Sequence, residues 1–400
     1  MRPLSILIVS ACLLIAGLAT AEPLEGRSIF IDAPEGRAIP IKIGEGYEPG
    51  EHWAGIVSEE HQRIVGLYPI TVAHGEAWTV ARGGQQTLTI IRDMKDDRAP
   101  SVRLTKRDDV NAIDVFVQGE LFTTYHYSND ERKPYLWPVK APGDVSVTRD
   151  WPMGERESSG DHPHHVSFWT GYGDINGNDY WEYGDRTGWQ RTESIEFGSG
   201  DACGWISTHI VWEDKGRKPV IDEHRTFRFY ASAPDSGERL FDVDVRFTAG
   251  YGDVKFGDTK EGGMVSVRMA DALRERGGTG TITTSEGITG VNEAWGKPAA
   301  WWDYSGTIEG VGTVGIAVMD SPTSFRHPTH WHVRDYGLMG ANAFGYSHFY
   351  NGVKNGDHTL AEGESLSFSY RILVHAGDAV LADVAGHYAD FANPPAVSIK

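Results

Sequence analysis

Apolar and polar positions alternate with a period of two along much of the chain. Residues 241–247 read FDVDVRF and residues 366–374 read LSFSYRILV, so that one face of each run is apolar. Successive side chains of a strand point to opposite faces of a sheet, and the alternation therefore predicts half-buried strands. Further strands are predicted at 28–31, 38–43, 86–91, 113–117, 223–230 and 265–269. A helix is predicted at 379–391.

This pattern predicts an all-β fold, because strands recur from end to end and turn signals separate them. We expect a large antiparallel β-sandwich, similar to a supersandwich, with a smaller N-terminal β domain. The charged stretch 94–100, which ends in Pro100, is a plausible linker. The expected domains are therefore residues 22–108 and 109–400. The 48 glycines and 13 tryptophans are typical of a turn-rich β protein.

The first 21 residues have the pattern of a secretory signal peptide. A short basic start precedes an apolar run over 4–18, and Ala19 and Ala21 supply small residues before the expected cleavage site. We therefore expect an exported protein, either periplasmic or extracellular. No later stretch has the ~20 apolar residues that a membrane span needs. Cys203 would be the one remaining cysteine, which excludes an internal disulfide.

The net charge of the chain disfavours some classes of binding partner. The formal net charge is −19, and a strongly acidic surface disfavours nucleic acid and anionic membranes. A phosphate-cradling glycine loop between a strand and a helix is not found, so no nucleotide cofactor is expected. A small molecule or an oligosaccharide remains as the expected substrate.

The densest group of chemically active side chains is Asp161-His162-Pro163-His164-His165. Pro163 disfavours helix, and in an extended segment His162 and His164 would point one way and His165 the other. Imidazoles at this density indicate acid/base chemistry or a metal site. Hydrogen bonding between loops is the alternative that the pattern leaves open.

A second histidine group lies far along the chain, at 327–336. His330 and His332 are two positions apart and can share a face of a strand. Arg334 and Asp335 follow, and an arginine can bind a carboxylate or sugar hydroxyls. Between the two groups, Lys260 and Glu261 occupy a loop rich in glycine. As neighbours in an extended segment they are expected to face opposite ways, one towards a ligand and one supporting it.

Aromatic side chains accompany these groups. Arg149 precedes the first histidine group, and Trp301 lies in the aromatic segment 296–306. Tryptophans can stack on sugar rings, although packing in the core is at least as common a role. The segment 174–179 lacks the final glutamate of a calcium loop, and its Asn176-Gly177 predicts a tight hairpin turn.

Several of these segments form a recognisable set, namely 132–138, 148–152, 161–165 with Asn176-Gly177, 258–263, 295–301 and 326–337. Together they resemble a bacterial family of largely unassigned function that carries the label PmoA family, or methane oxygenase PmoA. The resemblance runs from about residue 110 to 390. Methane oxygenation does not follow from it, because the membrane-bound subunit of that name has several spans. The end of the chain from 370 to 375 and the following helix also resemble galactose-mutarotase-like supersandwiches, which implies sugar epimerases, glycoside hydrolases or polysaccharide lyases.

Our leading hypothesis is an exported carbohydrate-active enzyme of hydrolase, lyase or epimerase type with a histidine-rich cleft. Its expected catalytic residues are His162, His164, His165, Glu261, His330 and His332. Its expected substrate-binding residues are Arg149, Lys260, Trp301, Arg334 and Asp335. One alternative is a metal-dependent enzyme, for example an oxygenase, whose divalent metal would be held by His162, His164, His330 and His332. The other is a non-catalytic carbohydrate-binding protein.

Overall fold

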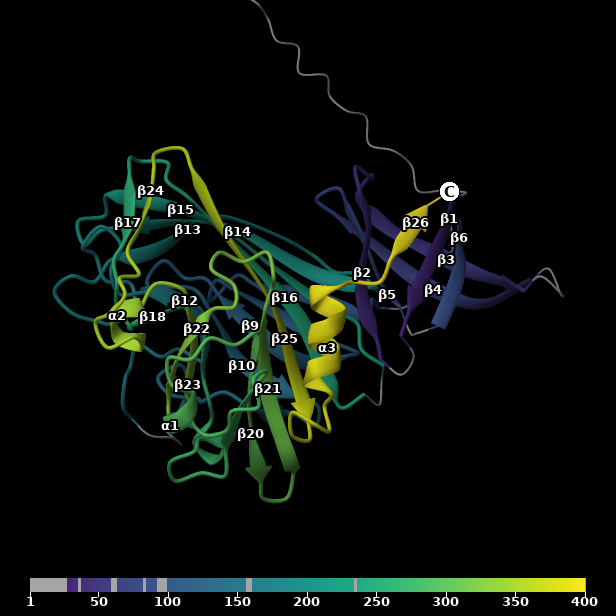
Figure 1. Cartoon of the computed structure of the whole chain (residues 1–400). Helices are drawn as coiled ribbons and strands as arrows, with labels where there is room; N and C mark the ends of the chain where they lie inside the picture. Colours follow the sequence, from purple (N-terminus) through teal and green to yellow (C-terminus); the bar gives the residue numbers. More distant parts are fainter. Residues whose placement is uncertain are drawn as a thin grey trace, which may run out of the picture.

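The computed structural model describes residues 27–34, 37–58, 63–81, 84–91, 99–155, 160–233 and 236–399. The expected signal peptide and most of the expected linker lie outside these residues. Strands form three large antiparallel sheets and one two-stranded ribbon, which confirms the all-β prediction (Figure 1). The described part of the chain contains no helix that is long and apolar enough to cross a bilayer.

The large sandwich consists of a nine-stranded and an eight-stranded sheet. In spatial order, the nine-stranded sheet contains β22 (His330–Arg334), β23 (Leu338–Asn342), β18 (Gly262–Arg268), β12 (Phe168–Tyr172), β10 (Tyr135–Ala141), β9 (Glu120–His126), β8 (Ala112–Val117) and β7 (Val102–Arg107), with β11 (Val145–Ser146) beside β10. The eight-stranded sheet contains β13 (Trp189–Gly198), β14 (Cys203–Glu213), β15 (Pro219–Tyr230), β16 (Glu238–Thr248), β25 (Ser365–Ala376), β21 (Gly312–Asp320), β20 (Trp301–Ile308) and β19 (Thr281–Thr284).

The N-terminal sheet has seven strands, and the last of them comes from the other end of the chain. Its order is β2 (Ile39–Glu45), β5 (Glu76–Ala81), β4 (Arg63–Ala73), β3 (Gly50–Ser58), β6 (Gly84–Ile91), β1 (Ser28–Ala33) and β26 (Val397–Ile399). The ribbon pairs β17 (Val254–Phe256) with β24 (His358–Leu360). The helices are α1 (Val291–Ala294), α2 (Tyr346–Phe349) and α3 (Val384–Ala392), with a 3₁₀ turn at Asp271–Leu273.

The two sheets of the sandwich share one hydrophobic core. Phe241 of β16 meets Phe168 of β12 at 5.5 Å and Phe122 of β9 at 5.7 Å between ring centroids. The predicted alternation also sets the pairing, since Val243 lies opposite Tyr370 and Val245 opposite Phe368. All of these side chains are buried. Burial of apolar side chains on both inner faces is the main force that holds the sandwich together.

The outer face of β25 is covered as well. Helix α3 packs on Ala317, Met319 and Leu373, and under it Arg371 forms a two-pronged ion pair with Asp242. This helix begins at Val384, so the predicted start at 379 is wrong. The Asp378 carboxylate accepts hydrogen bonds from the backbone N–H groups of Val380 and Leu381, which holds the residues before the helix in turns.

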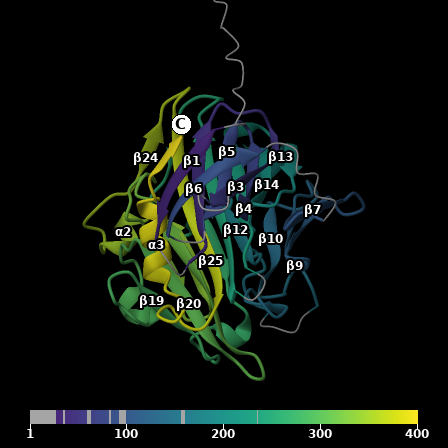
Figure 2. The same cartoon turned by 90° about the vertical axis from the view of Figure 1, so that its right-hand side faces the viewer.

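The N-terminal sheet has its own hydrophobic cluster, which includes Ile29, Ile41, Ile70 and Leu88, and it projects from the sandwich (Figures 1 and 2). Strand pairing crosses the expected domain boundary at residue 108 in two places. Strand β7 precedes that boundary but pairs with β8 of the nine-stranded sheet, and β26 pairs with β1.

Polar contacts attach the N-terminal sheet to the sandwich. The Thr71 hydroxyl of β4 accepts hydrogen bonds from the backbone N–H groups of Ala202 and Cys203, at 3.2 and 3.3 Å. Arg228 of β15 donates to Glu76 of β5 at 3.0 Å. Arg37 forms an ion pair with Asp390 of α3 at 2.9 Å. Because the contacts come from several strands and a helix, the two parts are fixed at more than one point.

Candidate functional site

The first histidine segment forms a compact turn that leads into β12. His162 has a left-handed backbone with φ 46°, and the N–H of His165 donates to the carbonyl of His162 at 3.0 Å. The expectation of an extended segment is therefore wrong. The turn brings the three imidazoles together, with His162 stacked on His165 at 4.9 Å and His164 edge-on to His165 at 4.4 Å.

Two buried arginines hold this turn in place. Arg149 donates to the carbonyls of Asp161, His162 and His165, and to the Asp161 carboxylate. Arg268 at the end of β18 donates to the same carboxylate at 2.6 Å and to Nδ1 of His165 at 3.0 Å. Arg149 was expected to bind substrate, and the structure shows it hydrogen-bonded to the turn. Arg268 was not expected, although a charged residue in the apolar run 265–269 was a signal.

The bond to Arg268 defines the state of His165. A guanidinium donates hydrogen bonds and cannot accept them, so Nδ1 of His165 must be the acceptor and the proton lies on Nε2. Burial and the neighbouring His164 hold the pKa of His165 well below its ordinary value. His165 is therefore a neutral imidazole at pH 7.

The second histidine segment is strand β22 at the edge of the same sheet. Trp331 and Val333 face the core, which leaves His330, His332 and Arg334 on the other face. The ring of His332 lies 6.0 Å from Trp181. Trp181 also contacts His165 at 5.5 Å and His164 at 6.4 Å. Trp181 thus joins two segments that are far apart in sequence, a role that the sequence did not reveal.

The loop before β18 completes the group. The Glu261 carboxylate lies 4.0 Å from Nδ1 of His332 and forms an ion pair with Lys260. Lys260 and Glu261 therefore face each other, contrary to expectation. The backbone bends here, and the side-chain amide of Asn342 donates to the carbonyls of Thr259 and Lys260. We call His164, His165, His332 and Glu261 around Trp181 the histidine site.

Three expected site residues have other surroundings. His330 bonds with the hydroxyl of Tyr350 at 2.9 Å and stacks on Phe349 of α2. Trp301 packs under α3 with Met319 and Val384, on the face of β20 opposite to the core residue Trp302. Asp335 is half-exposed, and its nearest basic partner is Arg276 at 3.7 Å. The described contacts do not bring these three to Trp181.

The four histidines expected to bind a metal do not all lie together. His330 is turned towards α2, whereas His332 faces Trp181. Within the described ranges, no group of three or more histidine, cysteine, aspartate or glutamate side chains is arranged to hold a metal ion. The donor set expected for a divalent metal, His162, His164, His330 and His332, thus does not fit a single ion.

Burial keeps the histidines of this region neutral. Burial and the positive charge of Lys133 lower the pKa of His164 to about 3. Burial and the charge of Arg334 hold the pKa of His332 well below its ordinary value. Burial also lowers the pKa of Lys133 to about 7, and this ammonium donates to the carbonyl of Trp181 at 2.9 Å. At pH 7 these imidazoles act as neutral donors and acceptors.

Several buried polar groups of the histidine site have no side-chain hydrogen-bond partner in the described structure. They are both ring nitrogens of His332 and the indole Nε1 atoms of Trp169 and Trp181. Each of these side chains is at least 99% buried. Native proteins rarely leave such groups unsatisfied, because each costs about 1–3 kcal/mol, and exceptions are frequent at functional sites.

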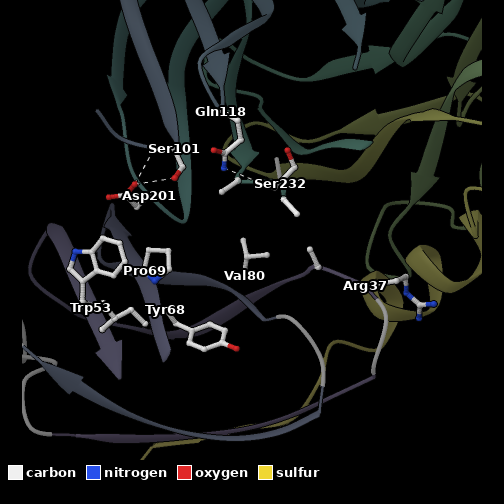
Figure 3. A pocket seen from close by; sticks show the side chains of 13 residues that line it. Arg37, Trp53, Tyr68, Pro69, Val80, Ser101, Gln118, Asp201 and Ser232 are labelled. Atoms are coloured by element: carbon white, nitrogen blue, oxygen red, sulfur yellow. Dashed lines mark hydrogen bonds between the residues drawn. The ribbon is translucent and has the colours of Figure 1, made fainter. Parts of the chain in front are cut away.

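A separate cavity of about 540 Å³ lies between the N-terminal sheet and the sandwich (Figure 3). Trp53, Tyr68 and Pro69 line it from the N-terminal sheet, and Gln118 and Asp201 line it from the other side (Figure 3). The histidines do not line any of the five cavities described in this structure. The histidine-rich cleft that the sequence suggested stays a prediction.

The chain belongs to a family of unknown function, DUF6807, whose pattern matches residues 112–389. A comparison with curated proteins gives no match. Among solved structures, two variants of a glycoside hydrolase family 97 enzyme from Pseudoalteromonas sp. strain K8, one in complex with panose, are similar at 12% and 11% identity. Their TM-scores are 0.28 and 0.27, and the match covers 70% of this chain and 34% of each enzyme. The chain spans about a third of their length, and a likeness of this size carries no argument about function.

Proposed function

We propose that this protein is an exported carbohydrate-active enzyme that works at the histidine site. The supporting observation is that segments 161–165 and 330–334 converge on Trp181, together with Glu261. Buried imidazoles, a carboxylate and indole N–H groups at one place are the usual components of acid/base catalysis on a polar substrate. Hydrolysis, elimination and epimerisation of sugars all require such proton transfers.

The surroundings favour different roles for the candidate groups. Glu261 lies beside Lys260 and is partly exposed, so we assign it proton transfer. His332 is neutral, and its ring nitrogens have no side-chain hydrogen-bond partner in the described structure, which suits a group that hydrogen-bonds substrate and exchanges a proton with it. His164 and His165 support Trp181 from the other side. We assign Arg149 and Arg268 a positioning role, because both hydrogen-bond the histidine turn.

A substrate screen tests this proposal. The full chain would be incubated with neutral and acidic oligosaccharides in D₂O, and NMR would report cleavage, elimination, epimerisation or deuterium exchange at carbon. For an active substrate, Glu261→Gln and His332→Gln should each lower kcat by about 10²–10⁴-fold, the range of general acid/base catalysis. His224→Gln, which replaces a histidine of the other sheet, should retain activity. Full turnover by both site variants would refute the proposal.

Sugar binding without turnover is the second candidate function, and the cavity in Figure 3 favours it. Trp53 and Tyr68 offer apolar surface, while Gln118, Asp201 and Ser101 offer polar groups, a combination that suits a sugar. This candidate predicts that Trp53→Ala abolishes affinity for an oligosaccharide and that His332→Gln leaves it unchanged. The reverse result would assign binding to the histidine site.

A further inference from the structure

Positive charge is concentrated beside the histidine site of an otherwise acidic protein. The chain has a formal net charge of −19. Yet Lys260 and Arg334 are close enough that the charge of Arg334 helps burial to lower the pKa of Lys260. The buried amino group of Lys133, whose pKa burial lowers to about 7, donates to the carbonyl of Trp181. Lys260 and Arg334 repel one another, and an anionic group between them would relieve this repulsion.

Arg334 is the second cation of this group. It is half-buried, and its guanidinium donates to the carbonyl of Val333 at 2.9 Å and lies 5.4 Å from the ring of Trp295. Among the described residues it forms no ion pair, and the adjacent Asp335 instead faces Arg276. Arginine in such a position is suited to a planar, two-pronged contact with a carboxylate.

The acids of this region do not neutralise it. Glu261 is already engaged by Lys260. Glu182 attracts Lys260 from the exposed loop after Trp181. Asp161 accepts from both Arg149 and Arg268 within the histidine turn. Arg334 therefore forms no ion pair with a carboxylate among the described residues, while Tyr336 hydrogen-bonds it and the charge of Asp335 attracts it.

The unsatisfied groups next to these cations also call for an acceptor. The indole Nε1 of Trp181 can only donate a hydrogen bond, and it has no partner in the described structure. The buried imidazole of His332 lies against the same indole and likewise has no side-chain partner there. An acceptor-rich anionic group would satisfy the donors and balance the cations together.

We propose that the histidine site takes an acidic sugar, a uronate or an oligosaccharide containing one, whose carboxylate is held by Arg334 and Lys260 next to His332. This inference rests on the proposed function and names its substrate class. A bound carboxylate would also remove part of the repulsion that keeps His332 neutral. His332 would then become a better proton acceptor once substrate is present, so that binding would prepare the acid/base group for reaction.

Binding of the full chain to matched ligands tests the proposal. Calorimetry would compare tri-galacturonate and tri-glucuronate with the neutral trisaccharides of galactose and glucose, and with sodium sulfate and phosphate. We expect a uronate to bind at least 10-fold more tightly than its neutral counterpart and than either inorganic anion. Equal affinity for uronate and neutral sugar would overturn the acidic-sugar assignment. Equal affinity for sulfate would show an inorganic anion site and overturn it as well.

Substitutions of Arg334 and Arg276 test which side chain holds the carboxylate. Arg334→Gln should weaken uronate binding at least 10-fold, by a larger factor than it weakens binding of neutral sugar, and Arg334→Lys should restore part of the loss. Arg276→Gln is the matched control, because Arg276 is an exposed arginine next to the same turn, and it should bind like the wild type. Unchanged uronate binding by Arg334→Gln would contradict the proposal.

A second readout does not depend on how well the variants fold. In the wild type, the indole N–H resonance of Trp181 should shift as uronate is added, and neutral sugar at the same concentration should shift it less, in line with its weaker binding. An unmoved resonance at saturating uronate would refute the assignment of the carboxylate to this place. The proposed function is tested separately, since loss of turnover in Glu261→Gln on a neutral substrate would support it even if uronates do not bind.

Discussion

The buried histidines are the residues whose chemistry depends most on the fold. An exposed imidazole has a pKa near 6.5, whereas burial lowers the pKa of His164 to about 3 and that of His330 to about 4. The sequence identified these residues as a group. Their protonation state could not be predicted, because it depends on burial by Trp181 and on cations that come from other parts of the chain.

Acid should therefore destabilise the protein before its carboxylates titrate. Below pH 6.5 the unfolded chain takes up protons on histidines that stay neutral in the folded state, so stability falls as pH decreases from 6.5 towards 4. Each such histidine contributes up to about 1.4 kcal/mol per pH unit. Urea unfolding at pH 7, 6 and 5 measures this slope. His164→Asn should reduce it by about one proton, and an unchanged slope would contradict the neutral assignment.

The low pKa of Lys133 predicts that the stability of the protein depends on pH between about pH 7 and 10. Burial lowers its pKa to about 7, so between pH 7 and 10 the unfolded chain binds the proton that the folded chain has lost. The contribution of Lys133 to stability thus improves as pH rises through this window. Relative to Lys133→Met, the wild type should gain up to about 1.4 kcal/mol of unfolding free energy from pH 8 to 9. A constant difference between the two proteins would show that Lys133 has an ordinary pKa.

At the scale of elements, the alternating pattern predicted the strands well. Residues 241–247 and 366–374 lie side by side in β16 and β25 with their apolar faces inward, and Asn176-Gly177 forms the expected turn, with both residues at positive φ. The helix start and the histidine turn were predicted less well. Both depend on specific hydrogen bonds, from Asp378 and from Arg149, that periodicity does not report.

The buried ion pair beneath α3 leads to a prediction about stability at the scale of elements. Arg371 of β25 and Asp242 of β16 are paired across strands and are about 95% buried. Removing one partner leaves the other charge buried alone, so Asp242→Asn should cost about 3–5 kcal/mol of unfolding free energy. Replacing both residues together, as Asp242→Leu with Arg371→Met, should cost less than the single change. A double variant that is less stable than either single one would contradict this account.

At the scale of the whole molecule, the sequence predicted a small N-terminal β unit beside a large sandwich. It did not predict that β26 at the C-terminal end would complete the N-terminal sheet. The hypothesis that the two histidine segments share one site did come from the sequence, and Trp181 contacts His164, His165 and His332, whereas His330 stacks on Phe349. Contacts between distant segments depend on the tertiary arrangement of the sheets. The alternation of apolar and polar residues along a single sequence does not report which distant segments are in contact.

The hydrogen bonds of Thr71 should link the unfolding of the two parts. Thr71→Val removes the acceptor of the Ala202 and Cys203 N–H groups while keeping the shape of the side chain. We expect a loss of about 1–3 kcal/mol, together with faster hydrogen exchange in β4 and β5 than in β16. Thr79→Val, which removes a hydrogen bond within the N-terminal sheet, is the control that should leave the link intact. Equal exchange changes in both variants would contradict the linking role.

The central claim is that two histidine segments form one functional site around Trp181. Its most direct test is an NMR titration of the full chain with the oligosaccharide that binds best, following the imidazole signals of His164, His165 and His332 together. The account predicts that all three signals shift with one common Kd, and that the signal of His224 on the other sheet does not. Shifts confined to one segment, or different Kd values for the two segments, would show that they do not act as one site.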